Sequence, residues 1–271
     1  MSVKINIDDY IVKKEKNIKL KDISSKYNGE ISKEEGQKRL NELIIKLNNL
    51  QEVLYADSSK SILLIFQAMD AGGKDSTIRH VFGPLNPQGC RVISFKAPTS
   101  VELTHDFLWR VHKNLPPKGM IGIFNRSHYE DVLIVRVKNL APKKTIEKRY
   151  NHINNFERMI FDEGVYIIKF YLHISKEYQK KRFERRLARA DKHWKFNPDD
   201  LKERDRWDDY KDAFEKVFSM CSKANAPWYI VPAETRWFRD LLVAEVVYKK
   251  LKSMNLKYPE PLFNPKDIII D

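Results

Sequence analysis

A short apolar run that leads directly into a loop with two glycines and a lysine constrains the fold of this chain most. The run is Ile62–Phe66 (I-L-L-I-F), and it is apolar on both faces, as a strand inside a parallel sheet is. Residues 67–77 then read Q-A-M-D-A-G-G-K-D-S-T. A turn needs a glycine or two but has no use for Lys74 directly after them. We therefore expect a buried strand that ends in a phosphate-binding loop.

The loop departs from the usual phosphate-binding pattern, G-x-x-x-x-G-K-[ST], in two places. Gly73 and Lys74 fit, whereas Ala68 replaces the first glycine and Asp75 replaces the hydroxyl residue. Backbone N–H groups beside a helix N-terminus would bind the phosphates. The predicted phosphate-binding residues of the loop are Ala71, Gly72, Gly73, Lys74, Asp75 and Ser76. The alternative is an ordinary helix entry, with glycines for the turn and acidic residues in the first turn.

A carboxylate inside such a loop would repel phosphate unless a cation lies between them. Asp70 is therefore the predicted ligand of Mg²⁺, or of Mn²⁺ in its place. A later strand, Met120–Phe124, ends in Asn125 instead of an aspartate, and an amide can orient a phosphate oxygen without adding charge. Arg126 follows, and its planar fork suits phosphate. We expect Glu130 or Asp131 to help from the outer sphere of the metal.

Together these residues form the predicted catalytic set: Asp70, Lys74, Asn125, Arg126 and Glu130. Lys96 follows the strand predicted at Arg91–Phe95, at the sheet edge where open α/β folds bind ligands. The predicted nucleotide-binding residues are Lys96, Arg126, Glu130 and Arg136. His128 has no orienting partner nearby in the sequence, so we expect it to pack or to form a structural hydrogen bond.

Four arginines, Arg182, Arg185, Arg186 and Arg189, follow helical spacing and are expected on one face of a helix. Between Lys176 and Lys195 there are nine Lys and Arg residues and three acidic ones. A solvated surface helix normally mixes charges more evenly. The stripe therefore indicates an anion-binding lid over the loop.

Strand patterns alternate with helical ones, which is typical of a mainly parallel α/β sheet. The strands are expected at Ile62–Phe66, Arg91–Phe95, Met120–Phe124, Val165–Leu172 and Trp228–Val231. The helices are expected at about 40–54, 100–113, 144–162, 176–190, 199–221 and 235–253. We expect an N-terminal arm at 1–38, a catalytic domain at 39–258 that includes a basic lid at about 175–205, and a tail at 259–271.

The 271 residues carry 50 Lys and Arg against 37 Asp and Glu, a formal charge of +13. Such a surplus indicates a polyanionic partner or only a solvated basic surface. The two cysteines have no metal-ligand spacing, which is typical of a reduced, cytoplasmic protein. We see no signal peptide and no membrane-spanning segment.

Three motifs together resemble those of the second polyphosphate kinase family: M-D-A-G-G-K-D-S-T, F-N-R-S-H-Y-E-D-V-L and A-P-W-Y-I-V-P-A-E-T-R-W. The resemblance covers about Leu40 to Tyr258. It implies a P-loop kinase-like three-layer α/β/α sandwich with a five-stranded sheet and a helical lid, and a homo-oligomer (dimer or tetramer). It also implies functional roles for Asp70, Lys74 and Arg126.

The activity implied by this resemblance is Mg²⁺-dependent, reversible phosphoryl transfer from inorganic polyphosphate to AMP and ADP, giving ADP and ATP. Asparagine at position 125 with Glu130 resembles the third class, which accepts both nucleoside mono- and diphosphates. Two alternatives stay open: an ATP-dependent nucleotide or small-molecule kinase, and a basic nucleic-acid-binding module. Few aromatic residues interleave with the arginines, which argues against a nucleic-acid partner.

Overall fold

In the described part of the computed structural model, five parallel strands form one sheet in the order β2-β3-β1-β4-β5. The structure describes residues 5–13, 18–27 and 29–270. The strands are β1 (Ser61–Ala68), β2 (Cys90–Ser94), β3 (Ile121–Asn125), β4 (Val165–His173) and β5 (Trp228–Pro232). Each overlaps a predicted apolar run, so the five-stranded parallel sheet is confirmed.

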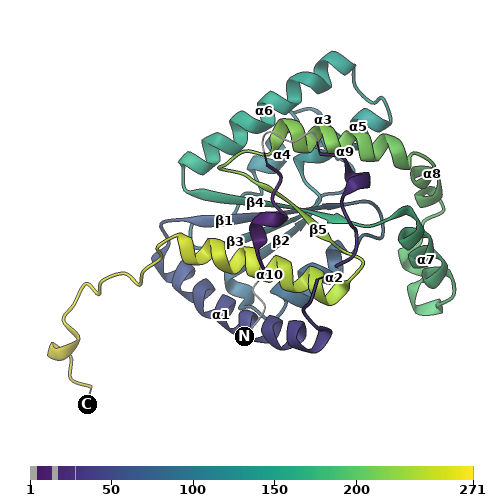
Figure 1. The fold of residues 1–271 in the computed structure, drawn as a ribbon. Coiled ribbons are helices and arrows are strands. Elements are labelled where there is room, and N and C mark those ends of the chain that lie inside the picture. The colour runs from purple at the N-terminus through teal and green to yellow at the C-terminus, as the bar shows by residue number, and fades with distance from the viewer. Residues whose placement is uncertain (1–4, 14–17, 28, 271) are drawn as a thin grey trace.

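Helices cover both faces of this sheet, which makes the three layers of the predicted sandwich (Figure 1). One face carries α1 (Lys33–Asp57), α2 (Lys74–Phe82) and α10 (Arg236–Ser253). The other carries α5 (Ile134–Val137), α6 (Lys143–Asp162) and α9 (Trp207–Cys221). The remaining α-helices are α3 (Ser100–Leu103), α4 (Trp109–His112), α7 (Lys176–Leu187) and α8 (Asp199–Asp205). Within the described ranges no helix is long and apolar enough to cross a membrane.

The sheet brings the two predicted functional segments together. In the register of β1 with β3, Phe66 lies opposite Asn125, so the loop after β1 and the residues after β3 leave the same edge. Helices α7 and α8, joined through the 3-10 helix η5 (Ala190–Lys195), project from this end of the molecule (Figure 1). The lid therefore lies next to the loop in space. The predicted domain boundaries stay predictions.

Several predicted helices have different limits in the structure. The helix expected at 100–113 is two single turns, because Asp106 accepts a hydrogen bond from the Leu108 amide and forms a local turn between them. The helix expected at 199–221 breaks at Arg206, whose guanidinium donates to the Val137 carbonyl at 2.7 Å. The first long helix begins at Lys33, inside the predicted arm, because Ser32 and Glu35 form a capping box.

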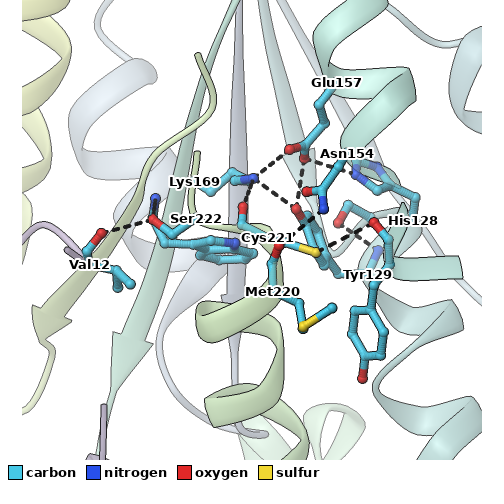
Figure 2. A network of polar contacts seen from close by, with 12 residues as sticks. Val12, His128, Tyr129, Asn154, Glu157, Lys169, Met220, Cys221 and Ser222 are labelled. Atoms are coloured by element: carbon cyan, nitrogen blue, oxygen red, sulfur yellow. Dashed lines mark hydrogen bonds and ion pairs between the residues drawn. The ribbon is translucent and has the colours of Figure 1, made fainter. Parts of the chain in front are cut away.

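A buried charged network ties the segment after β3 to the neighbouring elements (Figure 2). Lys169 of β4 is fully buried and uses all three ammonium donors: to Oε2 of Glu157 at 2.5 Å, the Tyr129 hydroxyl at 2.8 Å and the Cys221 carbonyl at 2.8 Å. Glu157 Oε1 accepts from Tyr129 at 2.8 Å and lies 3.2 Å from His128 Nε2. The prediction of a structural His128 is confirmed.

This network stabilises the 3-10 helix η4 (His128–Asp131), which directly follows Arg126. Burial opposes ionisation of Glu157, but Lys169 and His128 outweigh it and lower the pKa of the carboxyl. Burial lowers the pKa of Lys169. Because the folded pKa of Glu157 is depressed, its contribution to stability is present above its ordinary pKa of 4.5 and is lost as the pH falls through the folded value.

We expect Lys169→Met to lower the free energy of unfolding by about 3–5 kcal/mol, because it leaves Glu157 buried without its cation. The double variant Lys169→Met with Glu157→Gln should recover most of this loss, since no buried charge then lacks a partner. Urea denaturation at neutral pH measures both. A single variant as stable as the wild type, or a double variant no better than the single, would contradict this account.

Candidate active site

The loop between β1 and α2 has the backbone of a phosphate-binding turn. Gly73 takes φ +99°, a left-handed conformation that favours glycine, and it precedes α2 without a side-chain cap. The first amides of α2 therefore have no side-chain acceptor. Any side chain at Gly72 would overlap the Met69 carbonyl and the Ala68 methyl. Gly72 and Gly73 thus allow the turn, although Ala68 stands where the usual pattern has its first glycine.

Lys74 is the buried cation of this loop. It is 9% exposed, and its Nζ lies 3.4 Å from the Ala68 carbonyl. Burial and the nearby Arg126 lower the pKa of Lys74. The carboxylates of Asp70, Glu130 and Asp75 act in the opposite direction but do not offset this effect. A phosphate beside Nζ would favour its charged form, so the loop is electrostatically prepared for an anion.

Asp70 and Arg126 form the ion pair that joins the loop to the end of β3. Arg126 Nη2 donates to Asp70 Oδ1 at 2.9 Å, and both side chains keep part of their surface exposed. Arg126 has a positive φ of 63°, and its amide donates to the Phe66 carbonyl, which continues the β1–β3 ladder. Gln179 of the lid helix donates to the Asp70 carbonyl at 2.9 Å. One contact point therefore links the loop, the strand and the lid.

Asn125 is hydrogen-bonded to the loop as well. Its Nδ2 donates to Asp75 Oδ1 at 2.7 Å. The hydroxyls of Ser76 and Thr77 both donate to the Gly73 carbonyl, at 2.8 and 3.1 Å. Sequence reasoning placed Asn125 and Asp75 in the site separately, and their direct contact was not predicted.

A cavity of about 730 Å³ lies between the loop and the lid, and we call it the basic cavity. Its lining has twelve Lys and Arg residues and three Asp residues. The predicted residues that line it are Asp70, Ala71, Gly72, Gly73, Lys74, Asp75, Ser76, Lys96, Asn125, Arg126, Arg182, Arg185, Arg186 and Arg189. The structure thus brings the whole predicted phosphate-binding set to one cavity.

The spacing predicted all four lid arginines on one helix, but the structure places only three of them there. Helix α7 ends at Leu187, and Arg189 lies beyond it, paired with Asp191 at 2.9 Å. Arg186 is fixed by a hydrogen bond of 3.0 Å to the Lys195 carbonyl and lies 3.6 Å from Asp200. These contacts fold the chain back after α7, which is why the helical spacing stops applying. All four arginines still line the basic cavity.

A second cavity of about 370 Å³, the aromatic cavity, is also lined by Asp70 and Arg126. Trp207, Tyr210 and Phe214 of α9 contribute its aromatic side chains. Its charged lining has three Lys and Arg residues and five Asp and Glu residues, among them Glu130. Both cavities share Asp70, Arg126 and Asp200.

Two of the predicted nucleotide-binding residues do not line the aromatic cavity. Lys96 lines the basic cavity and not the aromatic one. Arg136 lines neither cavity; its Nη1 donates to Glu147 at 3.1 Å, across from α5 to α6. The pairing between the two helices turns Arg136 away from the site.

Sequence reasoning missed part of both linings. The unpredicted residues of the basic cavity are Arg79, His80, Ser94, Phe95, Ala97, Tyr178, Lys192, Lys195, Asp200, Arg236 and Arg239. Three of them had a signal: Arg236 lies in the third motif, A-P-W-Y-I-V-P-A-E-T-R-W, and Lys192 and Lys195 belong to the basic segment of the predicted lid. The aromatic side chains of the second cavity had no signal, since Trp207, Tyr210 and Phe214 have the spacing of the apolar face of a core helix.

Comparison with known families and proteins agrees with this geometry. Residues 30–259 match the family described as Polyphosphate kinase 2 (PPK2). The AMP/ADP-polyphosphate phosphotransferase of Meiothermus ruber is 50% identical over 226 residues, which are 83% of this chain and 85% of that protein. The ADP-polyphosphate phosphotransferase of Rhodopseudomonas palustris is 47% identical over 241 residues, 84% of this chain and 83% of the relative.

A solved structure supports the same assignment. The crystal structure of polyphosphate kinase 2 from Arthrobacter aurescens TC1 superposes with a TM-score of 0.90 at 40% identity, covering 92% of this chain and 90% of the other. The family match spans most of the chain, including the loop, the lid and both cavities. The chain therefore belongs to the polyphosphate kinase 2 family.

Proposed function

We propose that this protein transfers phosphoryl groups from inorganic polyphosphate to AMP and ADP. The observation that carries the proposal is the pair of cavities, one strongly basic and one aromatic, that meet at Asp70 and Arg126. Relatives of the family carry the names AMP/ADP-polyphosphate and ADP-polyphosphate phosphotransferase, which supports the same donor and acceptors.

The donor fits the basic cavity. A polyphosphate chain carries negative charge on every phosphate, and twelve Lys and Arg residues around one space offset that charge. Arg182 is half-buried in the lid, and burial together with Arg236 lowers its pKa, as expected of cations crowded without their counter-ion. A bound polyanion would relieve this repulsion.

The acceptor fits the aromatic cavity. Trp207, Tyr210 and Phe214 offer flat apolar surface for a nucleobase. The excess of acidic side chains there disfavours a long polyanion, whereas a nucleotide has only one charged end. That end would lie at Arg126, beside the terminal phosphate of the donor. Glu130 lines this cavity and not the basic one, in keeping with its predicted role at the acceptor.

The reaction needs positioning and charge neutralisation more than acid–base chemistry. An oxygen of the acceptor phosphate bonds to the terminal phosphorus, the bond from that phosphorus to the bridging oxygen breaks, and the shortened polyphosphate leaves with the electron pair. The attacking oxygen is already ionised at neutral pH, so no strong base is required. Lys74, Arg126 and the loop amides would hold the reacting phosphates in line.

Mg²⁺ fits the residues that are present. The described part of the chain has no cluster of three or more His, Cys, Asp or Glu residues for a metal, which is no obstacle, because Mg²⁺ usually binds one or two carboxylates together with substrate phosphates and water. Asp70 would hold it, with Asp75 and Asn125 close by. When bound, the ion would neutralise charge on the phosphates.

The direct test is to incubate the protein with Mg²⁺, polyphosphate and either AMP or ADP, and to follow products by chromatography. We expect ADP from AMP and ATP from ADP. A protein that phosphorylates AMP from ATP while ignoring polyphosphate would be an ATP-dependent kinase instead. A protein that binds RNA with no turnover of either nucleotide would be a nucleic-acid-binding module.

Lys74→Ala or Asp70→Asn should reduce the transfer rate by about 100-fold or more, because the first removes a cation from the reacting phosphates and the second removes the charge that would hold Mg²⁺ beside them. Neither should unfold the protein, since both side chains lie at the cavity and not in the apolar core. Steady-state kinetics and thermal melting measure the two effects. Rates close to wild type in either variant would remove the loop from the mechanism.

Replacing Arg182 and Arg186 together with alanine should raise the KM for polyphosphate about tenfold or more, from the loss of charge-assisted contacts. The KM for ADP should change much less, because the acceptor lies in the other cavity. The matched control is Lys180→Ala with Lys181→Ala, which removes two charges from the same helix outside both linings. An equal loss for donor and acceptor would contradict the division between the cavities.

A further inference from the structure

Arg239 is a buried cation at the inner wall of the basic cavity. It lies in the fourth position of α10, between Phe238 and Asp240, and is 2% exposed. It nevertheless lines the cavity, and a side chain built at Gly73 would overlap its Nη1. The guanidinium therefore lies directly behind the phosphate-binding turn.

Contacts with one carboxylate fix the Arg239 side chain. Its Nε donates to Asp240 Oδ1 at 2.8 Å, and Nη2 lies at the same distance from that oxygen as an ion pair. The other oxygen of Asp240 lies 2.9 Å from Nδ1 of His80, which comes from α2 and also lines the cavity. The carboxylate thus holds one side of the guanidinium and leaves the other side toward the loop.

Most donors of this guanidinium have no acceptor. Arginine has five N–H groups, and the bond from Nε to Asp240 is the only hydrogen bond of Arg239 within residues 5–13, 18–27 and 29–270. Its Nη2 is fully buried and meets Asp240 as an ion pair without hydrogen-bond geometry, whereas Nη1, beside Gly73, donates no hydrogen bond to any described residue. Buried donors of a charged group are costly to leave without acceptors, so an oxyanion is the missing partner that the site suits.

We propose that Arg239 binds an inner phosphate of the donor chain, next to the one that is transferred. This inference rests on the proposed function, since it assigns a place to the polyphosphate within the basic cavity. The transferred phosphate lies between Lys74 and Arg126, and the following phosphates pass Gly73 and reach the guanidinium of Arg239. From there the chain leaves along the lid arginines.

The alternative role of Arg239 is purely structural, as the ion pair that joins α10 to α2 through Asp240 and His80. The two roles predict different behaviour. If the pair is only structural, changing either partner should lower the stability of the protein and affect the binding of both substrates equally. A phosphate ligand loses donor affinity when Arg239 is changed, and keeps it when only the charge of Asp240 is removed.

The test uses tripolyphosphate as the probe and titrates it calorimetrically into the intact protein without nucleotide. Arg239→Lys keeps a cation for Asp240 but lacks the planar fork, so we expect the affinity for tripolyphosphate to fall about tenfold or more. Asp240→Asn should keep it within about threefold, because the guanidinium remains and a nearby negative charge is lost. The KM for ADP should stay within about twofold in both variants.

Arg158→Lys is the matched control, because Arg158 is exposed on α6, pairs with Asp162 and lines neither cavity. Unchanged tripolyphosphate affinity in Arg239→Lys, with a wild type that binds the probe, would overturn the inference and leave the proposed function intact. A wild type that neither binds tripolyphosphate nor transfers phosphate from longer chains would overturn both. If Arg239→Lys fails to fold, a tenfold loss of probe affinity in folded Asp240→Asn overturns the inference.

Discussion

The ion pair between Asp70 and Arg126 is the interaction on which the rest of the site depends. It joins the end of the loop after β1 to the end of β3, and it forms the boundary between the basic and the aromatic cavity. Arg126 takes a left-handed backbone conformation to reach this place. Such a conformation costs energy and is kept where its surroundings fix it, here by the ladder bond to β1 and by the buried Lys169–Glu157 network under η4.

Charge separation between the two cavities explains how one site can hold two anionic reactants. The basic cavity would suit a partner with charge along its whole length, and the aromatic cavity one with a neutral body and a charged end. Their shared residues, Asp70, Arg126 and Asp200, lie where the two anions would otherwise repel each other most. A divalent cation at Asp70 would act at this same point, which accounts for a carboxylate in a loop built for phosphate.

Sequence reasoning predicted the sheet, the loop and the lid because each has a local signal. Ile62–Phe66 is apolar on both faces, Gly73 and Lys74 have fixed spacing, and the lid arginines cluster in the chain. It could not predict what tertiary contacts decide. Arg189 leaves the helix because the chain folds back onto Arg186, Arg136 turns toward Glu147, and Arg239 lies buried in α10. The aromatic cavity was not predicted either, since helix side chains that line a pocket have the same sequence spacing as side chains that pack into a core.

In the proposed reaction, polyphosphate in the basic cavity and the nucleotide in the aromatic cavity meet end to end at Asp70 and Arg126. A crystal structure of the protein with ADP and a polyphosphate analogue whose bridging atoms block transfer tests this most directly. We expect phosphate density along the loop, Lys74 and the lid arginines, and the nucleobase against Trp207, Tyr210 or Phe214. A nucleotide bound in the basic cavity, with the analogue outside it, would contradict the account.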